Sequence, residues 1–258
     1  MKEHIQNFIK YKDLLIELII KDIKLKYRNS VLGVLWSLLN PLLIMVVLTI
    51  VFSALFKNNI EHFPLYVLIG RILYSFFSED TNFAMDSVYT NGSLIRKVYV
   101  PKYFFPLARV CSSFVTMLIS LVLIFGAMAV SGVPFSPVNL LIVFPLFYLF
   151  LTALGIGLLL ATICVFFRDL KHLYSVILMV VMYMTPIFYP ASIIPEQYRP
   201  IVELNPLFPI VEMFRDLTMY HTLPSVGTHL IALAHGAAYV LIGLFVFYKK
   251  QDRFIFHL

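Results

Sequence analysis

Few residues in this chain have the types and spacing that catalysis would need. None of its 10 glycines begins a G-x-x-x-x-G-K-[ST] phosphate-binding loop, and there is no G-x-S-x-G or H-E-x-x-H pattern. The two cysteines, Cys111 and Cys164, lie in apolar runs, which favours packing over a disulfide or a metal site. The acids nearest to a catalytic pair are Glu79 and Asp80. They leave open one enzymatic alternative, an integral-membrane transferase acting on lipid-linked sugars.

The segments that must position these residues are unusually apolar. The 258 residues are 60% hydrophobic and only 13% charged, with a mean hydropathy of +0.89. Average soluble domains are about 45–50% apolar and about 25% charged. A soluble fold of this composition would expose large apolar patches, which soluble proteins avoid. The composition therefore predicts an integral membrane protein.

Six stretches are long and apolar enough to cross a bilayer core, which takes about 20 helical residues. They are 34–56, 63–83, 107–131, 139–166, 173–190 and 226–248. None shows the alternating polarity of a membrane β-barrel. We therefore expect an all-α integral membrane fold with six transmembrane helices. A secondary carrier is a weaker alternative, because it usually needs acids near the membrane midplane.

Basic residues orient these spans. Sixteen of the 20 Lys and Arg residues precede the first span, follow the last, or flank the links after spans two and four. The positive-inside rule places that side in the cytoplasm. Both termini are then cytoplasmic, as an even number of spans requires.

Two domains follow from this organisation. Residues 1–33 form a cytoplasmic N-terminal segment, in which polar and apolar residues of 5–28 alternate with the period of an amphipathic helix lying in the membrane interface. Residues 34–258 form the six-span transmembrane domain. Its external connection, 191–225, follows a cluster of prolines that continues into it, yet it stays partly apolar. This pattern favours short, broken re-entrant helices before the last span.

The connection 84–106 is the only long cytoplasmic loop. Ser93 is a candidate cap for a short helix that Pro101 would end. Arg96, Lys97 and Lys102 make this helix basic, and such a helix suits docking onto another protein.

Two charge pairs are expected at the cytoplasmic ends of the spans. Arg168 and Asp169, in the turn after span four, would hold neighbouring helix ends by charge-assisted hydrogen bonds. Asp80 and Arg109, at the ends of adjacent antiparallel spans, are the second candidate pair.

Two stretches resemble the type-2 ABC (ABC-2) exporter permeases for bacterial cell-surface polysaccharides. The first, KDIKLKYRNSVLGVLWSLLNPLL (21–43), resembles the entry to their first span. The second, 166–216, is similar to their pattern of an FRD turn, a P-I-F-Y-P span end, an I-P motif, N-P and a following Arg. Here these are Phe167 to Asp169, Pro186 to Pro190, Ile194-Pro195, Asn205-Pro206 and Arg215.

The resemblance implies a transport subunit, and no enzyme. Such permeases form homodimers in the bacterial cytoplasmic (inner) membrane and bind two copies of a separate ATPase. ATP and Mg would be bound by that partner, so this chain needs no cofactor or metal of its own. The 84–106 helix would meet the ATPase. The implied cargo is a glycan on a polyprenyl diphosphate lipid, such as O antigen or teichoic acid, or a capsular polymer; nucleic acid is not an expected partner.

Aromatic residues make up 16% of the chain, more than two interfacial belts require. A sugar ring offers a C–H face that can lie on an aromatic ring. A row of rings would bind each sugar weakly and let a polymer slide, and the resemblance supports such a lining. The candidates for a translocation path are Phe52, Tyr74, Phe77, Tyr183 and Phe188. For each of them, packing in the core or against lipid is an equally good interpretation.

Overall fold

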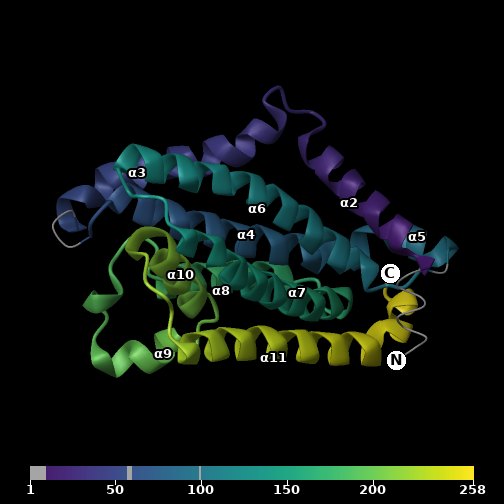
Figure 1. Cartoon of the computed structure of the whole chain (residues 1–258). Helices are drawn as coiled ribbons and strands as arrows, with labels where there is room; N and C mark the ends of the chain where they lie inside the picture. Colours follow the sequence, from purple (N-terminus) through teal and green to yellow (C-terminus); the bar gives the residue numbers. More distant parts are fainter. Residues whose placement is uncertain (1–9, 57–59, 99) are drawn as a thin grey trace.

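The computed structural model describes residues 10–56, 60–98 and 100–258. Within them the chain is helical and has no strand, which confirms the all-α part of the predicted fold class. Five long helices run side by side (Figure 1): α3 (Trp36–Phe56), α4 (Phe63–Thr90), α6 (Phe104–Ser131), α7 (Val143–Phe166) and α11 (Val226–Lys250). The helix α8 (Leu170–Met184) is shorter.

Each predicted span coincides with a helix, but the helices differ in their fitness to cross a membrane. Four apolar segments in the described residues are long enough: Gly33–Phe52, Phe104–Ser131, Pro137–Phe166 and Val226–Phe256. Helix α4 has 28 residues but carries Arg71, Glu79 and Asp80 along its length. Helix α8 has 15 residues, because the chain turns at Thr185, before the expected span end at 190.

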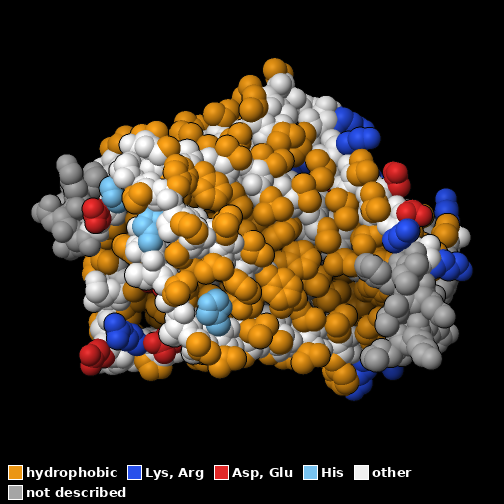
Figure 2. Space-filling model, in the orientation of Figure 1, with side chains coloured by type: hydrophobic (Ala, Val, Ile, Leu, Met, Phe, Trp, Pro, Cys, Tyr) orange, Lys and Arg blue, Asp and Glu red, His pale blue; other side chains and the backbone are white. Residues whose placement is uncertain are grey.

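Helix α4 forms the centre of the bundle. It packs against α3, α6, α7 and α10, and most of its residues are buried. By contrast, α3 is almost uniformly apolar and largely exposed. Figure 2 shows hydrophobic side chains over the middle of the molecule, while Lys and Arg gather toward the end formed by α2 and α5. This distribution matches a bundle whose middle faces lipid.

Small residues let α7 approach its neighbours closely. A Cβ at Gly155 would collide with the backbone of Tyr239 and Val240 in α11, and a Cβ at Gly157 would lie 2.8 Å from Ala84 Cβ in α4. Helix α7 can therefore lie between α4 and α11 only because glycine occupies these positions.

The amphipathic helix predicted over 5–28 appears as α2 (Lys12–Tyr27), and residues 5–9 of that prediction lie outside the described residues. Leu15 and Leu18 are buried in a cluster with the ends of α4, α6 and α11, whereas Ile16 and Ile20 are exposed. The last residues fold back as η6 (Gln251–Phe256), whose Phe254 is fully buried in the same cluster. Thus α2 and the C-terminal residues lie at one end of the bundle (Figure 1).

The segment 191–225 contains the expected short helices, which are η3 (Ala191–Ile193), η4 (Glu196–Tyr198), α9 (Arg199–Glu203), α10 (Leu207–Arg215) and the π-helical turn η5 (Asp216–Tyr220). Helix α10 is buried against α4 and α7.

Two residues of the 166–216 motif pattern, Asn205 and Arg215, attach the 191–220 segment to the bundle. The Asn205 side chain donates to Thr185 Oγ1 at 2.8 Å and accepts from the Leu207 N–H at 3.1 Å, which ties the start of α10 to the turn after α8. Arg215 is 1% exposed and donates to the carbonyls of Tyr66 and Ile187, at 3.1 and 3.3 Å. These two motif positions therefore serve structure.

Candidate functional site

The exposed basic helix at the charged end of the bundle is α5 (Gly92–Lys97), which lies directly after α4. Its inward residue, Ile95, is buried in the cluster of α2 and η6, and this contact orients the opposite face outward. Ser93, Arg96 and Lys97 are exposed on that face. The predicted cap is wrong: the helix begins at Gly92, so Ser93 lies inside it. The helix ends at Lys97, before Pro101.

The C-terminal residues bind both α5 and Lys102, which precedes α6. Arg96 Nη2 donates to the Leu258 carbonyl at 2.8 Å, and Lys102 Nζ donates to the Gln251 carbonyl at 2.7 Å. Lys102 also lies over the Phe254 ring. Of the predicted coupling residues, Lys97 and Ser93 present their side chains without such a bond among the described residues, whereas Arg96 and Lys102 are partly engaged within the chain.

The ion pairs at this end differ from those expected. Arg109 pairs with Asp22 of α2 at 3.3 Å, so the predicted pair with Asp80 is wrong; Asp80 is fully buried inside the bundle. The prediction considered only partners within the spans, whereas the acid comes from α2, which lies along α6. Burial raises the pKa of the Asp22 carboxyl, and the nearby Arg109 guanidinium partly opposes that rise.

The turn after α7 is also held differently. Arg168 lies over the Tyr89 ring at 4.6 Å, and Asp169 stands before α8 without a side-chain capping bond. The ion pair that joins α8 to α4 is Lys171 with Asp86, at 2.7 Å. Arg168 does reach the end of a neighbouring helix, but by a cation–π contact instead of a charge-assisted hydrogen bond.

The predicted aromatic residues fall into two groups. Phe52 and Phe188 stack with ring centroids 5.1 Å apart, and Tyr183 meets Phe188 edge-on at 6.1 Å. This cluster joins α3 to the end of α8, and Tyr183 is 57% exposed. Tyr74 and Phe77 are buried in the core of the chain, and the Tyr74 hydroxyl donates to the Leu178 carbonyl at 2.8 Å. Of the two groups, only the first has a well exposed ring, that of Tyr183.

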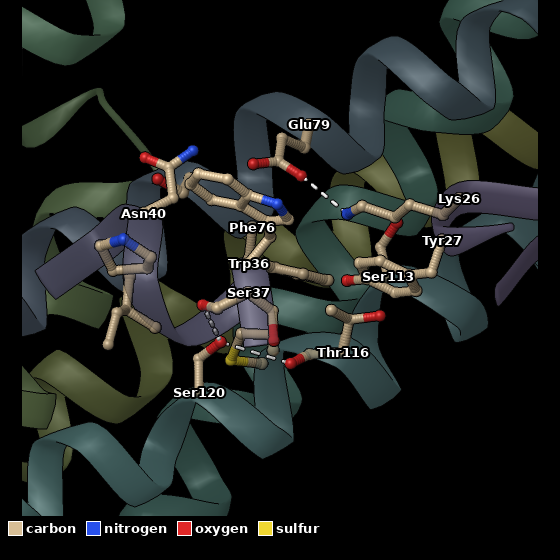
Figure 3. A pocket seen from close by; sticks show the side chains of 14 residues that line it. Lys26, Tyr27, Trp36, Ser37, Asn40, Phe76, Glu79, Ser113, Thr116 and Ser120 are labelled. Carbon is tan, nitrogen blue, oxygen red and sulfur yellow. Dashed lines mark hydrogen bonds and ion pairs between the residues drawn. The ribbon is translucent and has the colours of Figure 1, made fainter. Parts of the chain in front are cut away.

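A cavity of about 190 Å³ opens where α2, α3, α4 and α6 meet. Figure 3 shows the side chains that line it, including hydroxyls from α6 and the Trp36 indole from the start of α3. Lys26 Nζ and Glu79 Oε2 form an ion pair of 2.9 Å at its edge. Glu79 stands out in the sequence, but the cavity does not, because the residues that line the cavity come from four helices with no common motif.

This all-helical bundle, with its apolar middle and one basic end carrying a short exposed helix, has the architecture of a membrane protein. The chain belongs to the ABC-2 type transporter family, whose model matches residues 13–219.

Relatives along nearly the whole chain carry names that agree with this class. The chain is 29% identical over 249 residues to an O-antigen export system permease protein of Klebsiella pneumoniae, covering 94% of this chain and 93% of that protein. It is 28% identical to the O-antigen export system permease protein of Myxococcus xanthus, covering 97% of each. It is 24% identical to a polysialic acid transport protein of Escherichia coli, covering 89% of this chain and 88% of that protein.

Proposed function

We propose that this chain is the permease subunit of an ABC exporter that moves a lipid-linked polysaccharide across the bacterial cytoplasmic membrane. Its relatives are named for export of O antigen and transport of polysialic acid, and they align with it nearly end to end. A separate ATPase subunit binds ATP and Mg and supplies the energy, since the sequence has no phosphate-binding loop.

The observation that carries the proposal is the position of α5. This helix projects Arg96 and Lys97 from the basic end of the bundle while Ile95 anchors it from behind. A short, exposed helix that is anchored by a buried residue is suited to transmit a movement of a partner to α4. Helix α5 follows α4 directly in the chain. Charged residues on such a helix fix the register of docking more than its affinity.

In this proposal the chain crosses the membrane six times, with α4 and α8 as the second and fifth spans. The charges of α4 are compatible with that role because Asp80 is buried and Glu79 is paired with Lys26. Both termini lie in the cytoplasm, as the basic residues near α2 and η6 favour. The short helices of 191–220 dip into the outer leaflet from outside.

Two copies of the chain enclose the translocation path, and each binds one ATPase subunit. The exposed face of α3 together with Tyr183 and Phe188 lines that path in each copy, which is consistent with the exposure of α3 and Tyr183 and with the edge-on contact between Tyr183 and Phe188. The cargo is a glycan carried on a polyprenyl diphosphate lipid.

The transferase alternative has less support. Its two candidate acids are Glu79 and Asp80, and they do not face one open site. Glu79 is held by the Lys26 ammonium at 2.9 Å, and Asp80 is completely enclosed.

Charge reversal on α5 tests the proposal. The complex with its ATPase is assembled in vesicles, and glycan export and ATP hydrolysis are measured for a variant carrying Arg96→Glu and Lys97→Glu. We expect export to be lost while the protein inserts normally. Lys97→Glu alone keeps the Arg96 bond to the C-terminal residues and separates docking from local folding.

The matched control reverses Lys249 and Lys250, two basic residues at the same end but on α11. Export should survive in that variant. Full export and normal assembly by the α5 variant would contradict the proposed coupling surface. ATP hydrolysis by the purified chain alone would contradict the proposal that a separate subunit hydrolyses ATP.

A further inference from the structure

The cavity between α2, α3, α4 and α6 has the chemistry of a sugar-binding site. Besides the Lys26–Glu79 ion pair, it is lined by the Asn40 amide and by the hydroxyls of Ser113 and Ser120 (Figure 3). The Trp36 indole adds a broad aromatic surface that is 47% exposed. Directional donors and acceptors beside one aromatic face suit a pyranose ring, which has hydroxyls around its edge and C–H groups on its faces.

One polar atom in this cavity lacks a partner. The Tyr27 phenol lines it, and its buried oxygen has no hydrogen-bond partner within the described residues. A buried hydroxyl left unsatisfied costs about 1–3 kcal/mol. A turn of the phenol toward the cavity would let a ligand hydroxyl supply the missing hydrogen bond.

The charge balance selects among possible ligands. An isolated Lys26 would favour a phosphate or diphosphate, but Glu79 lies 2.9 Å from its ammonium and neutralises it. An anion entering the cavity would therefore meet a carboxylate as well as an ammonium, whereas a neutral sugar can donate to Glu79 and accept from Lys26 at once. The side chains of Lys26 and Glu79 are 30% and 49% exposed, so a ligand can reach both.

Size limits the ligand further. At about 190 Å³ the cavity is smaller than the roughly 300–1,000 Å³ typical of pockets for drug-sized ligands. It has room for about six waters at ~30 Å³ each, which is space for one sugar unit and not for a chain of them.

We propose that this cavity binds a single uncharged sugar unit of the exported glycan, with Glu79 as hydrogen-bond acceptor, Lys26 as donor and Trp36 as stacking surface. The identity of the glycan as cargo rests on the proposed function; the binding chemistry rests on the cavity alone. Because the cavity lies at the junction of α2 with α3 and beside the middle of α4, it would hold the sugar between the basic end of the bundle and the outer segment.

Trp36 makes the proposal directly testable, since it is the only tryptophan in the chain. The purified full chain, in lipid vesicles without scaffold protein or ATPase, is titrated with glucose, galactose, mannose and rhamnose, and separately with inorganic pyrophosphate, while tryptophan emission is recorded. We expect a saturable change with at least one neutral sugar, with midpoints in the millimolar range, and no saturable change with pyrophosphate.

The variant Glu79→Gln sharpens the test. It removes a charged acceptor, so sugar affinity should fall about tenfold, the loss of one charge-assisted hydrogen bond. It also frees the Lys26 ammonium, so pyrophosphate should now alter the emission. The control Glu196→Gln changes an exposed acid in η4, far along the sequence from the cavity, and should leave both titrations unchanged.

A parent response to pyrophosphate but to no sugar, or to neither, would overturn the assignment, as would equal sugar binding by Glu79→Gln. The titration needs neither ATPase nor export. Its failure would leave the exporter proposal intact, and a failure of export in the charge-reversal experiment would leave the titration interpretable.

Discussion

Arg215 offers the sharpest test of how the outer segment is held. Its guanidinium is 1% exposed, lies 3.3 Å from the centroid of the Tyr66 ring, and donates to Glu212 and to the carbonyls of Tyr66 and Ile187. A Cβ at Gly70 would come within 2.8 Å of the same guanidinium, so the site admits no larger residue beside it. One side chain thus joins α10, α4 and the turn after α8.

Replacement of Arg215 by Met keeps apolar volume but removes every donor. The Ile187 carbonyl then lacks this partner, at about 1–3 kcal/mol, while the Tyr66 carbonyl keeps only its bond within α4, and a desolvated cation–π contact of about 2 kcal/mol is lost. Methionine sulfur on the ring recovers roughly 0.3–1.5 kcal/mol, and Glu212, whose side chain is 33% exposed, can rehydrate. We therefore expect a loss of about 3–5 kcal/mol, the usual cost of removing one partner from a buried ionic site.

The assay is thermal unfolding of the detergent-solubilised chain followed by circular dichroism. For a chain of this length, about 3–5 kcal/mol corresponds to a fall of roughly 6–20 °C in Tm. Arg215→Lys keeps the charge but not the forked geometry and should fall between parent and Met variant. Arg199→Met, at an exposed arginine of α9, is the control and should unfold with the parent. Equal Tm values for Arg215→Met and Arg199→Met would refute this account.

Two further predictions concern other contacts. Gly155→Ala should push α7 away from α11 and lower Tm by several degrees, whereas Gly126→Ala, where a Cβ meets no atom within 4 Å, should be neutral or stabilising; equal effects would contradict the close crossing. Arg109→Gln should raise the pKa of Asp22 further, because burial would then be opposed only by the weaker effect of Lys21. The native state would bind the extra proton, so stability should fall more steeply than in the parent as the pH rises above the ordinary carboxyl pKa of 3.8, and adding Asp22→Asn should abolish that extra slope.

The helices could be predicted from the sequence because long apolar runs have few other options in a membrane. The ends were less predictable. Span five was expected to reach 190 but α8 ends at Met184, since Thr185 and Asn205 hold the following turn through a hydrogen bond between residues 20 positions apart. The apolar pattern of the sequence does not indicate that hydrogen bond.

Partners of charged residues were the least predictable feature. Arg109 was assigned to Asp80 by assuming that neighbouring spans satisfy each other, yet it binds Asp22 on a helix outside the spans. Likewise, the helix ends that Arg168 and Asp169 were expected to hold are joined by an ion pair between Asp86 and Lys171. Choosing among nearby acids depends on rotation of each helix about its axis, which hydrophobic patterning fixes only to within about one residue.

Helix α4 connects the features that the sequence named separately. It is about 42 Å long at 1.5 Å per residue and continues directly into α5 at one end. Near the other end of α4, Arg215 donates a hydrogen bond to the Tyr66 carbonyl. Between the two ends, Glu79 lines the cavity. Because α4 is one helix, buried on most sides, it joins α5, Glu79 and the outer turn through a single packed element. In an exporter, the same helix would link energy input, sugar contact and the outer segment.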